Sequence, residues 1–185
     1  MLAGNCISDF VKGKKKLGYP LPIQQGIQLH REIDSYTDQH PATRKAKDLF
    51  RPVYRLYSGA IVDVIYDHFL AADENEFTSS SLMEFSKYVY ETLDNYRSWL
   101  PENFAKMFFY MKENNWLYHY RELAGAEKSI GGVIRRAKYI DDPRPAIELL
   151  AQHYQLLGDL YRQFWIDLKS FALEQFQLLT GKEPK

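Results

Sequence analysis

The side chains with the clearest chemical potential are a histidine and two aspartates in the sequence GIQLHREIDSYTDQHP. His30, Asp34 and Asp38 are spaced four residues apart, so on an α-helix they lie along one face. At about 100° per residue, this row continues the apolar stripe that begins with Ile23 and Ile27. We therefore predict that His30 and Asp34 point toward the interior of the protein.

A second acidic row lies in the sequence LYSGAIVDVIYDHFLA. Asp63 and Asp67 are one helical turn apart, and His68 lies more to the side. On the same angular count, both aspartates continue a stripe that begins with Leu56 and Ala60. Two carboxylates at this spacing repel each other, and burying one alone costs several kcal/mol unless a cation or a partner neutralises it. If the two helices pack side by side, we expect one histidine and three aspartates to meet inside a helical bundle and bind a metal.

These candidate ligands combine imidazole and carboxylate groups, which suit manganese, iron or zinc, and the excess of carboxylates favours the harder metals. Asp9, in the sequence NCISDFVKGK, is a candidate to join them from the preceding helix. Asp38 has three interpretations: a ligand, a hydrogen-bond acceptor for His30, or a turn former before Pro41. In the alternative without a metal, these histidines and aspartates satisfy one another, or pair with an arginine or tyrosine, within the core.

The elements that must position these residues are helices. No segment alternates as a strand does, and glycine and proline fall between periodic segments. Residues 13–22 are expected to form a loop, and Pro52 to kink or divide the third helix. The sequence therefore predicts an all-α fold, a single-domain helical bundle over residues 1–185. The periodicity predicts helices at about residues 4–15, 22–39, 43–74, 80–98, 101–113, 116–138 and 144–179.

Composition narrows the possible partners and the compartment. Lysine plus arginine and aspartate plus glutamate each number 24, so the net charge is zero, which argues against nucleic acid as a partner. The single cysteine, Cys6, excludes an internal disulfide and fits a reducing compartment. The chain shows no signal peptide and no long apolar run, so we expect a cytoplasmic protein without a membrane partner. The sequence leaves the oligomeric state open.

Four segments carry a resemblance to a known family: GNCISDFVKG, GIQLHREIDSYTDQHP, LYSGAIVDVIYDHFLA and NNWLYHYRELAG. Their order and separations resemble those of the bacterial acyl carrier protein phosphodiesterases, or acyl carrier protein hydrolases. The resemblance implies an HD-domain-like, all-helical phosphohydrolase whose metal is usually Mn²⁺, with Mg²⁺, Fe²⁺ or Zn²⁺ as alternatives. The implied reaction hydrolyses the 4′-phosphopantetheine arm from holo acyl carrier protein, a protein of fatty acid biosynthesis, and releases apo acyl carrier protein.

The resemblance also assigns roles by position. Asp9 falls at a motif aspartate that is either a ligand or a catalytic group. Metal ligands are implied in the His-Arg-x-Ile-Asp and Asp-x-x-x-Asp-His segments, namely His30, Asp34, Asp63, Asp67 and His68. Members of the family usually begin with an additional histidine-rich segment, and this chain starts at Met1, just inside that point. If that segment supplies a ligand, we expect either that the site of this chain is incomplete or that its start is misassigned.

The implied mechanism uses a metal-bound water. Asp9 or Asp38 is the candidate acceptor for its proton, and Arg31 is the candidate cation for the phosphate charge. The substrate is a small acidic protein, and the lysine run in VKGKKKLG would attract it. These partner-binding candidates are Lys12, Lys14, Lys15 and Lys16. Two alternatives remain: an HD-like phosphohydrolase of nucleotides or other small phosphodiesters, and a non-catalytic helical interaction module.

Overall fold

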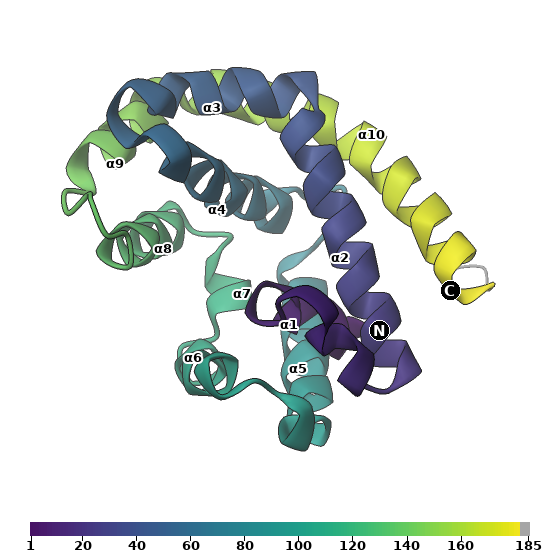
Figure 1. Ribbon diagram of the computed structural model, residues 1–185. Coiled ribbons are helices and arrows are strands. Elements are labelled where there is room, and N and C mark those ends of the chain that lie inside the picture. The colour runs from purple at the N-terminus through teal and green to yellow at the C-terminus, as the bar shows by residue number, and fades with distance from the viewer. Residues whose placement is uncertain (182–185) are drawn as a thin grey trace. The chain divides into compact units, whose positions relative to one another are not determined.

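The computed structural model describes residues 1–181, and its regular elements there are helices only, as Figure 1 shows. The all-α prediction is therefore confirmed. Within the described residues, no helix combines the length and the apolar character needed to cross a lipid bilayer. The α-helices are α1 (Leu2–Ile7), α2 (Leu21–Gln39), α3 (Pro41–Tyr54), α4 (Ser58–Ala72), α5 (Ser79–Asn95), α6 (Glu102–Glu113), α7 (Trp116–His119), α8 (Leu123–Arg135), α9 (Arg144–Gln152) and α10 (Tyr154–Thr180).

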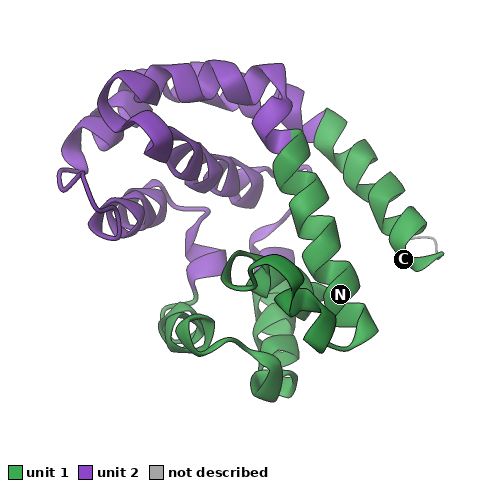
Figure 2. Cartoon of the chain, in the orientation of Figure 1, with its two compact units in different colours: residues 1–36, 83–115, 167–185 green, residues 37–82, 116–166 purple. Residues whose placement is uncertain are grey.

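The chain forms two compact units, coloured separately in Figure 2. Unit 1 contains residues 1–36, 83–115 and 167–185, and unit 2 contains residues 37–82 and 116–166. Each unit is assembled from segments that lie far apart in the sequence. The expectation of one domain over residues 1–185 stays a prediction.

In unit 1, α1 crosses the first half of α2 at two glycines. A Cβ at Gly4 would lie 2.1 Å from the carbonyl oxygen of Ile23, and a Cβ at Gly26 would lie 2.0 Å from that of Met1. Only glycine permits such backbone contact, so both positions are required by the crossing. The fully buried side chains around this junction and the neighbouring helices include Ile7, Ile23, Ile27, Leu93 and Phe104.

The first predicted helix, residues 4–15, is shorter than expected. α1 ends at Ile7, a 3₁₀ turn covers Ser8–Phe10, and Val11 is extended with φ −113° and ψ 96°. The expected loop at 13–22 instead contains a 3₁₀ helix, Gly13–Gly18, which begins at a glycine with φ 57°. A continuous helix would carry Asp9 away from α2, whereas the turn brings it back.

In unit 2, α4 packs against α3 and α8, and α9 contacts both α3 and α8. The hydroxyl of Tyr54 links α3 to the start of α9, because it accepts from the Ala146 N–H at 2.9 Å and donates to the Asp142 carbonyl at 2.9 Å. The fully buried side chains of this core include Phe50, Ile61, Ile65, Ile130, Ile134 and Leu150.

Three predicted helices are divided in the structure. The predicted 43–74 helix breaks at Arg55, which has φ 47°, rather than at Pro52, which lies within α3. The predicted 116–138 helix breaks before α8, where a Cβ at Gly125 would lie 2.0 Å from the His119 carbonyl oxygen. The predicted 144–179 helix breaks at His153, between α9 and α10. At Gly125 the break involves close backbone packing between residues six positions apart, which periodicity does not register.

Candidate metal centre

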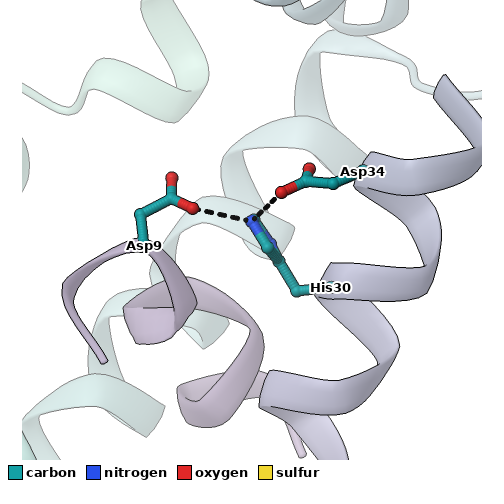
Figure 3. Close-up of side chains that lie close together, drawn as sticks. All are labelled: Asp9, His30 and Asp34. Atoms are coloured by element: carbon teal, nitrogen blue, oxygen red, sulfur yellow. Dashed lines mark hydrogen bonds and ion pairs between the residues drawn. The ribbon is translucent and has the colours of Figure 1, made fainter. Parts of the chain in front are cut away.

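The structure brings Asp9, His30 and Asp34 together within unit 1. Figure 3 shows Asp9 on the turn after α1 and the other two side chains one turn apart on α2, with both carboxylates directed at the imidazole. The donor atoms of these three residues, one from each, lie within 4.8 Å of one another. We call this set the His30 cluster.

The position of Asp9 is fixed by the chain on both sides of it. The Ser8 hydroxyl donates to the Ile27 carbonyl at 3.4 Å, and the Arg31 guanidinium donates to the Val11 carbonyl at 2.6 Å. Together with the glycine crossing of α1 and α2, these bonds hold the turn against the second and third turns of α2. Asp9 is therefore positioned by the glycines of the crossing and by the bonds of its neighbours Ser8 and Val11, rather than by its own side chain.

Both carboxylates approach the same nitrogen of the imidazole. Asp9 Oδ1 and Asp34 Oδ2 each lie 3.2 Å from His30 Nε2. Although partial burial disfavours the charged imidazole, the hydrogen bonds that its N–H donates to Asp34 and Asp9 raise the pKa of His30 to about 9. The hydrogen bond to His30 lowers the pKa of Asp9 below its usual value. The cluster thus stabilises positive charge at one point, whether carried by a proton or by a bound cation.

The donor set fits a divalent metal. One imidazole nitrogen and two carboxylate oxygens are ligands that manganese, iron and zinc share. Ligands about 2.1 Å from one ion lie at most about 4.2 Å apart. Small rotations of these side chains would therefore bring all three donor atoms within reach of one ion. Three protein ligands also leave coordination positions for water and substrate, as catalytic metal sites require.

The cluster lies at the surface, which corrects the expected inward orientation of Asp34. The side chains of Asp9 and Asp34 are 74% and 57% exposed, whereas that of His30 is 23% exposed. Ile23 and Ile27 are buried as predicted, and the row then emerges into solvent along α2. This exposure leaves the donor atoms of the cluster open to ligands from solution.

Asp63 and Asp67 belong to unit 2, so their meeting with the His30 cluster stays a prediction. Both side chains are exposed on α4, and the prediction that they face the core is wrong. The Asp67 carboxyl touches solvent but has protein on many sides, and this desolvation, together with the charge of Asp63, raises the pKa of Asp67 to about 7. The Asp67 carboxyl would therefore gain from a nearby cation.

His68 has protein partners at both ring nitrogens, which does not fit the predicted ligand role. Nδ1 lies 2.7 Å from the Tyr120 carbonyl oxygen, and Nε2 lies 2.8 Å from the Tyr154 hydroxyl. A carbonyl only accepts, so Nδ1 carries the proton and Nε2 accepts from the tyrosine. Burial lowers the pKa of His68, which keeps the ring neutral. His68 therefore connects α4 to the segments that follow α7 and begin α10.

Asp38 pairs with Lys47, a residue that the sequence pattern did not single out. Lys47 is buried on α3, and its Nζ lies 2.5 Å from Asp38 Oδ1. The structure does not support Asp38 as a hydrogen-bond acceptor for His30, because its carboxylate neutralises Lys47 instead. Helical periodicity could have indicated that Lys47 is buried, since it lies four residues after buried Thr43 and three before buried Phe50 on α3.

Comparisons with known proteins follow the same sequence segments. A family model described as acyl carrier protein phosphodiesterase matches residues 1–168. An acyl carrier protein phosphodiesterase of Enterobacter sp. (strain 638) is 32% identical over 165 residues, covering 89% of this chain and 86% of the relative. Relatives of that name from Photorhabdus laumondii and Escherichia coli O6:H1 are each 30% identical over 89% of this chain, covering 83% and 86% of their own lengths.

No solved structure matches the chain. The family match includes the His30 cluster, the Asp63–Asp67 pair and His68, because all of them lie before residue 168. The extent of the family match and the identity to these relatives settle the assignment. The chain belongs to the acyl carrier protein phosphodiesterase family.

Proposed function

We propose that this chain is a metal-dependent phosphoric diester hydrolase that removes the 4′-phosphopantetheine arm from holo acyl carrier protein. The reaction is the one that the family name describes, and the family match covers residues 1–168. The single observation that carries the proposal for the site is the convergence of Asp9 and Asp34 on Nε2 of His30. The proposal includes an HD-domain-like site, in which histidine and aspartate side chains on helices bind the metal.

The proposed metal ligands in unit 1 are His30 and Asp34, with Asp9 as either the third ligand or a catalytic group. Asp63 and Asp67 of α4 stay candidate ligands, as the resemblance to the family implies. Mn²⁺ is the proposed ion, and Mg²⁺, Fe²⁺ and Zn²⁺ are its alternatives, since all accept oxygen or mixed ligands. A bound divalent cation would lower the pKa of a coordinated water and polarise a phosphoryl oxygen. His68 is no longer part of the proposed ligand set, because both its ring nitrogens have protein partners.

The chain's own residues supply binding and proton transfer. Asp9 is the proposed general base in the case where it is not a ligand, because its carboxylate adjoins the cluster and its side chain is open to solvent. Asp38 is the weaker candidate, since its carboxylate neutralises Lys47. Arg31 is the proposed phosphate contact. The Val11 carbonyl fixes one of its nitrogens, and the guanidinium has further N–H donors for phosphate oxygens.

A mass measurement tests the function. Purified protein with Mn²⁺ is incubated with holo acyl carrier protein, and the carrier is weighed by mass spectrometry. Loss of the phosphopantetheine arm is expected, with a rate that falls at least about 100-fold in Asp34→Asn. Asp48→Asn, at an exposed acid of α3 outside the site, is the matched control and should keep the rate.

Two outcomes contradict the proposal, and each favours one alternative. If the carrier keeps its mass while a nucleotide or another small phosphodiester is cleaved, the chain is a general HD-like phosphohydrolase. If no phosphodiester is cleaved and no divalent metal binds by calorimetry, the chain is a non-catalytic helical module.

A further inference from the structure

Residues 10–19, here called the lysine strap, run along α2 and are attached to it at three points. Side chains at positions 31, 28 and 24 of α2 contact positions 11, 16 and 19 of the strap, so the two segments run in opposite directions. The three bonds are Arg31 Nη2 to the Val11 carbonyl at 2.6 Å, Lys16 Nζ to Gln28 Oε1 at 2.6 Å, and Gln24 Nε2 to the Tyr19 carbonyl at 2.7 Å.

Aromatic contacts hold both ends of the strap inside unit 1. Phe10 packs edge-on against Phe104 of α6, with ring centroids 5.4 Å apart. Tyr19 packs against Trp99, with ring centroids 6.0 Å apart. The strap is therefore ordered before any partner arrives, and a preordered surface loses less conformational entropy on binding.

The strap is a concentrated positive charge on a chain whose net charge is zero. Residues 10–31 contain four lysines and one arginine and no aspartate or glutamate. Lys12, Lys14 and Lys15 are exposed, whereas Lys16 is partly buried and bonded to Gln28. The four lysines, which are neighbours in the sequence, therefore differ in the structure. Three face solvent, and the fourth, Lys16, fastens the strap to α2.

Two large exposed aliphatic side chains follow these cations in the sequence. Leu17 and Leu21 are 64% and 67% exposed, at the end of the 3₁₀ helix and at the start of α2. Pro20 and Pro22 flank Leu21 and restrict the backbone there. A surface that served only to attract anions would need no exposed leucines. Their presence fits a partner whose docking face is acidic around an apolar centre.

We propose that Lys12, Lys14 and Lys15, together with Leu17 and Leu21, are the docking surface for the acidic carrier protein. This inference rests on the proposed function. The lysines attract the carrier and set its orientation, and the leucines contribute the apolar contact that keeps it bound. Because the strap begins directly after Asp9, a carrier that docks on it presents its phosphodiester beside the His30 cluster.

Paired variants separate the two contributions. Lys14→Glu/Lys15→Glu reverses the exposed charge, and Leu17→Ser/Leu21→Ser removes the apolar contact. The matched controls are Lys45→Glu/Lys87→Glu, at exposed helical lysines that are not part of the strap, and Leu178→Ser, at a leucine of α10 that is 71% exposed. Circular dichroism and thermal unfolding establish that each variant is folded.

Binding of fluorescently labelled holo acyl carrier protein is followed by anisotropy, and its hydrolysis by mass spectrometry. We expect either strap variant to raise the Kd and the KM for the carrier about tenfold or more. In Lys14→Glu/Lys15→Glu, the salt dependence of binding should also become much weaker, whereas in Leu17→Ser/Leu21→Ser it should be retained. Both control variants should match the original chain.

Unchanged carrier binding in both strap variants would overturn the docking surface and leave the proposed function standing. Failure of the original chain to bind or cleave the carrier would overturn the function and the docking surface together. Sedimentation that shows the strap occupied by a second copy of this chain, released by Leu17→Ser/Leu21→Ser, would assign the surface to self-association instead.

Discussion

The α1–α2 junction and the exposed side of α4 carry nearly the same residue types at the same helical spacing, yet the structure uses them differently. At the junction, two carboxylates meet one imidazole nitrogen, and the pKa of His30 rises to about 9. On α4, the histidine turns away from the aspartates into the core and bonds two tyrosines, and its pKa falls. Spacing sets which side chains share a face, but other elements decide which partners each one meets.

The comparison also separates a surface site from a structural connection. The His30 cluster is assembled around an exposed nitrogen that a cation can reach, whereas both nitrogens of His68 are already saturated. Replacing each histidine should therefore damage a different property of the protein, and the following predictions begin with that contrast.

His30→Ala should have the largest effect on activity. Loss of the only imidazole in the cluster removes the atom on which both carboxylates converge, so we expect activity to fall by at least about 100-fold and Mn²⁺ affinity to fall with it. Because the charged imidazole pairs with both carboxylates but is only partly buried, the free energy of unfolding without metal should fall by about 1–2 kcal/mol near neutral pH, less than in His68→Ala. Calorimetric titration with Mn²⁺ and urea unfolding measure the two effects, and retained metal affinity would remove His30 from the site.

His68→Ala should show the opposite balance. The change leaves the Tyr154 hydroxyl and the Tyr120 carbonyl without their partner and opens a cavity beside α4, so unfolding should become easier by about 2–4 kcal/mol. Metal affinity should change less than it does in His30→Ala. An effect on metal affinity as large as that of His30→Ala, in protein that remains folded, would restore His68 to the ligand set.

Gly26→Ala should loosen the junction without touching any polar residue of the cluster. The added Cβ would lie 2.0 Å from the Met1 carbonyl oxygen, so α1 must move away from α2 and carry Asp9 with it. We expect a loss of stability of about 1–3 kcal/mol and a clearly weaker Mn²⁺ affinity. Gly18→Ala, where a Cβ would meet nothing within 4 Å, is the matched control. Equal metal affinity in the two variants would show that the glycine crossing does not position Asp9.

The two histidines should also titrate in opposite directions. His30 has a folded-state pKa of about 9, above the ordinary value of 6.5, so in metal-free protein its contribution to stability is complete below pH 6.5 and is lost as pH rises through 9. His68 has a lowered pKa, so its contribution is complete above 6.5 and is lost as pH falls through its folded-state pKa. NMR titration of the ring protons measures both pKa values, and the variants His30→Asn and His68→Asn identify which signal belongs to which histidine. Two rings that both titrate near 6.5 would contradict both environments.

The sequence predicted the residues of the site better than their orientation. The helical stripe through Ile23 and Ile27 is buried, so the row starting there identified His30 and Asp34 correctly as neighbours that meet. On α4 the angular count started from Leu56, which is 97% exposed, and the predicted apolar stripe was in fact the solvent side. An aliphatic residue at the end of a helix is a poor reference for the buried face, because burial there depends on the neighbouring elements.

The periodicity of the apolar residues predicted which segments are helical. The positions at which the helices end also depend on contacts between residues that are distant in the sequence. The break at Arg55 is followed by a 3₁₀ turn in which the Tyr57 hydroxyl accepts from the Lys138 N–H at 3.1 Å, a contact across 81 positions of sequence. The attachment of the lysine strap to α2 also depends on glutamines, which carry no periodic signal. Local patterns therefore predicted the fold class and the residues of the cluster, but not the turns that bring Asp9 to His30.

Asp38→Asn should have the smallest effect, because it tests an acid that shares the α2 row but not the cluster. The change removes the charge that neutralises buried Lys47, and since Asp38 itself is 73% exposed, the loss of stability should be about 1 kcal/mol. Mn²⁺ affinity should remain within about twofold of the original chain, in contrast to Asp34→Asn, because Asp38 is bonded to Lys47 rather than to His30. Urea unfolding and metal titration of both variants provide the measurement. If Asp38→Asn weakens metal binding as much as Asp34→Asn, the site extends one turn further along α2 and Lys47 holds a ligand in place.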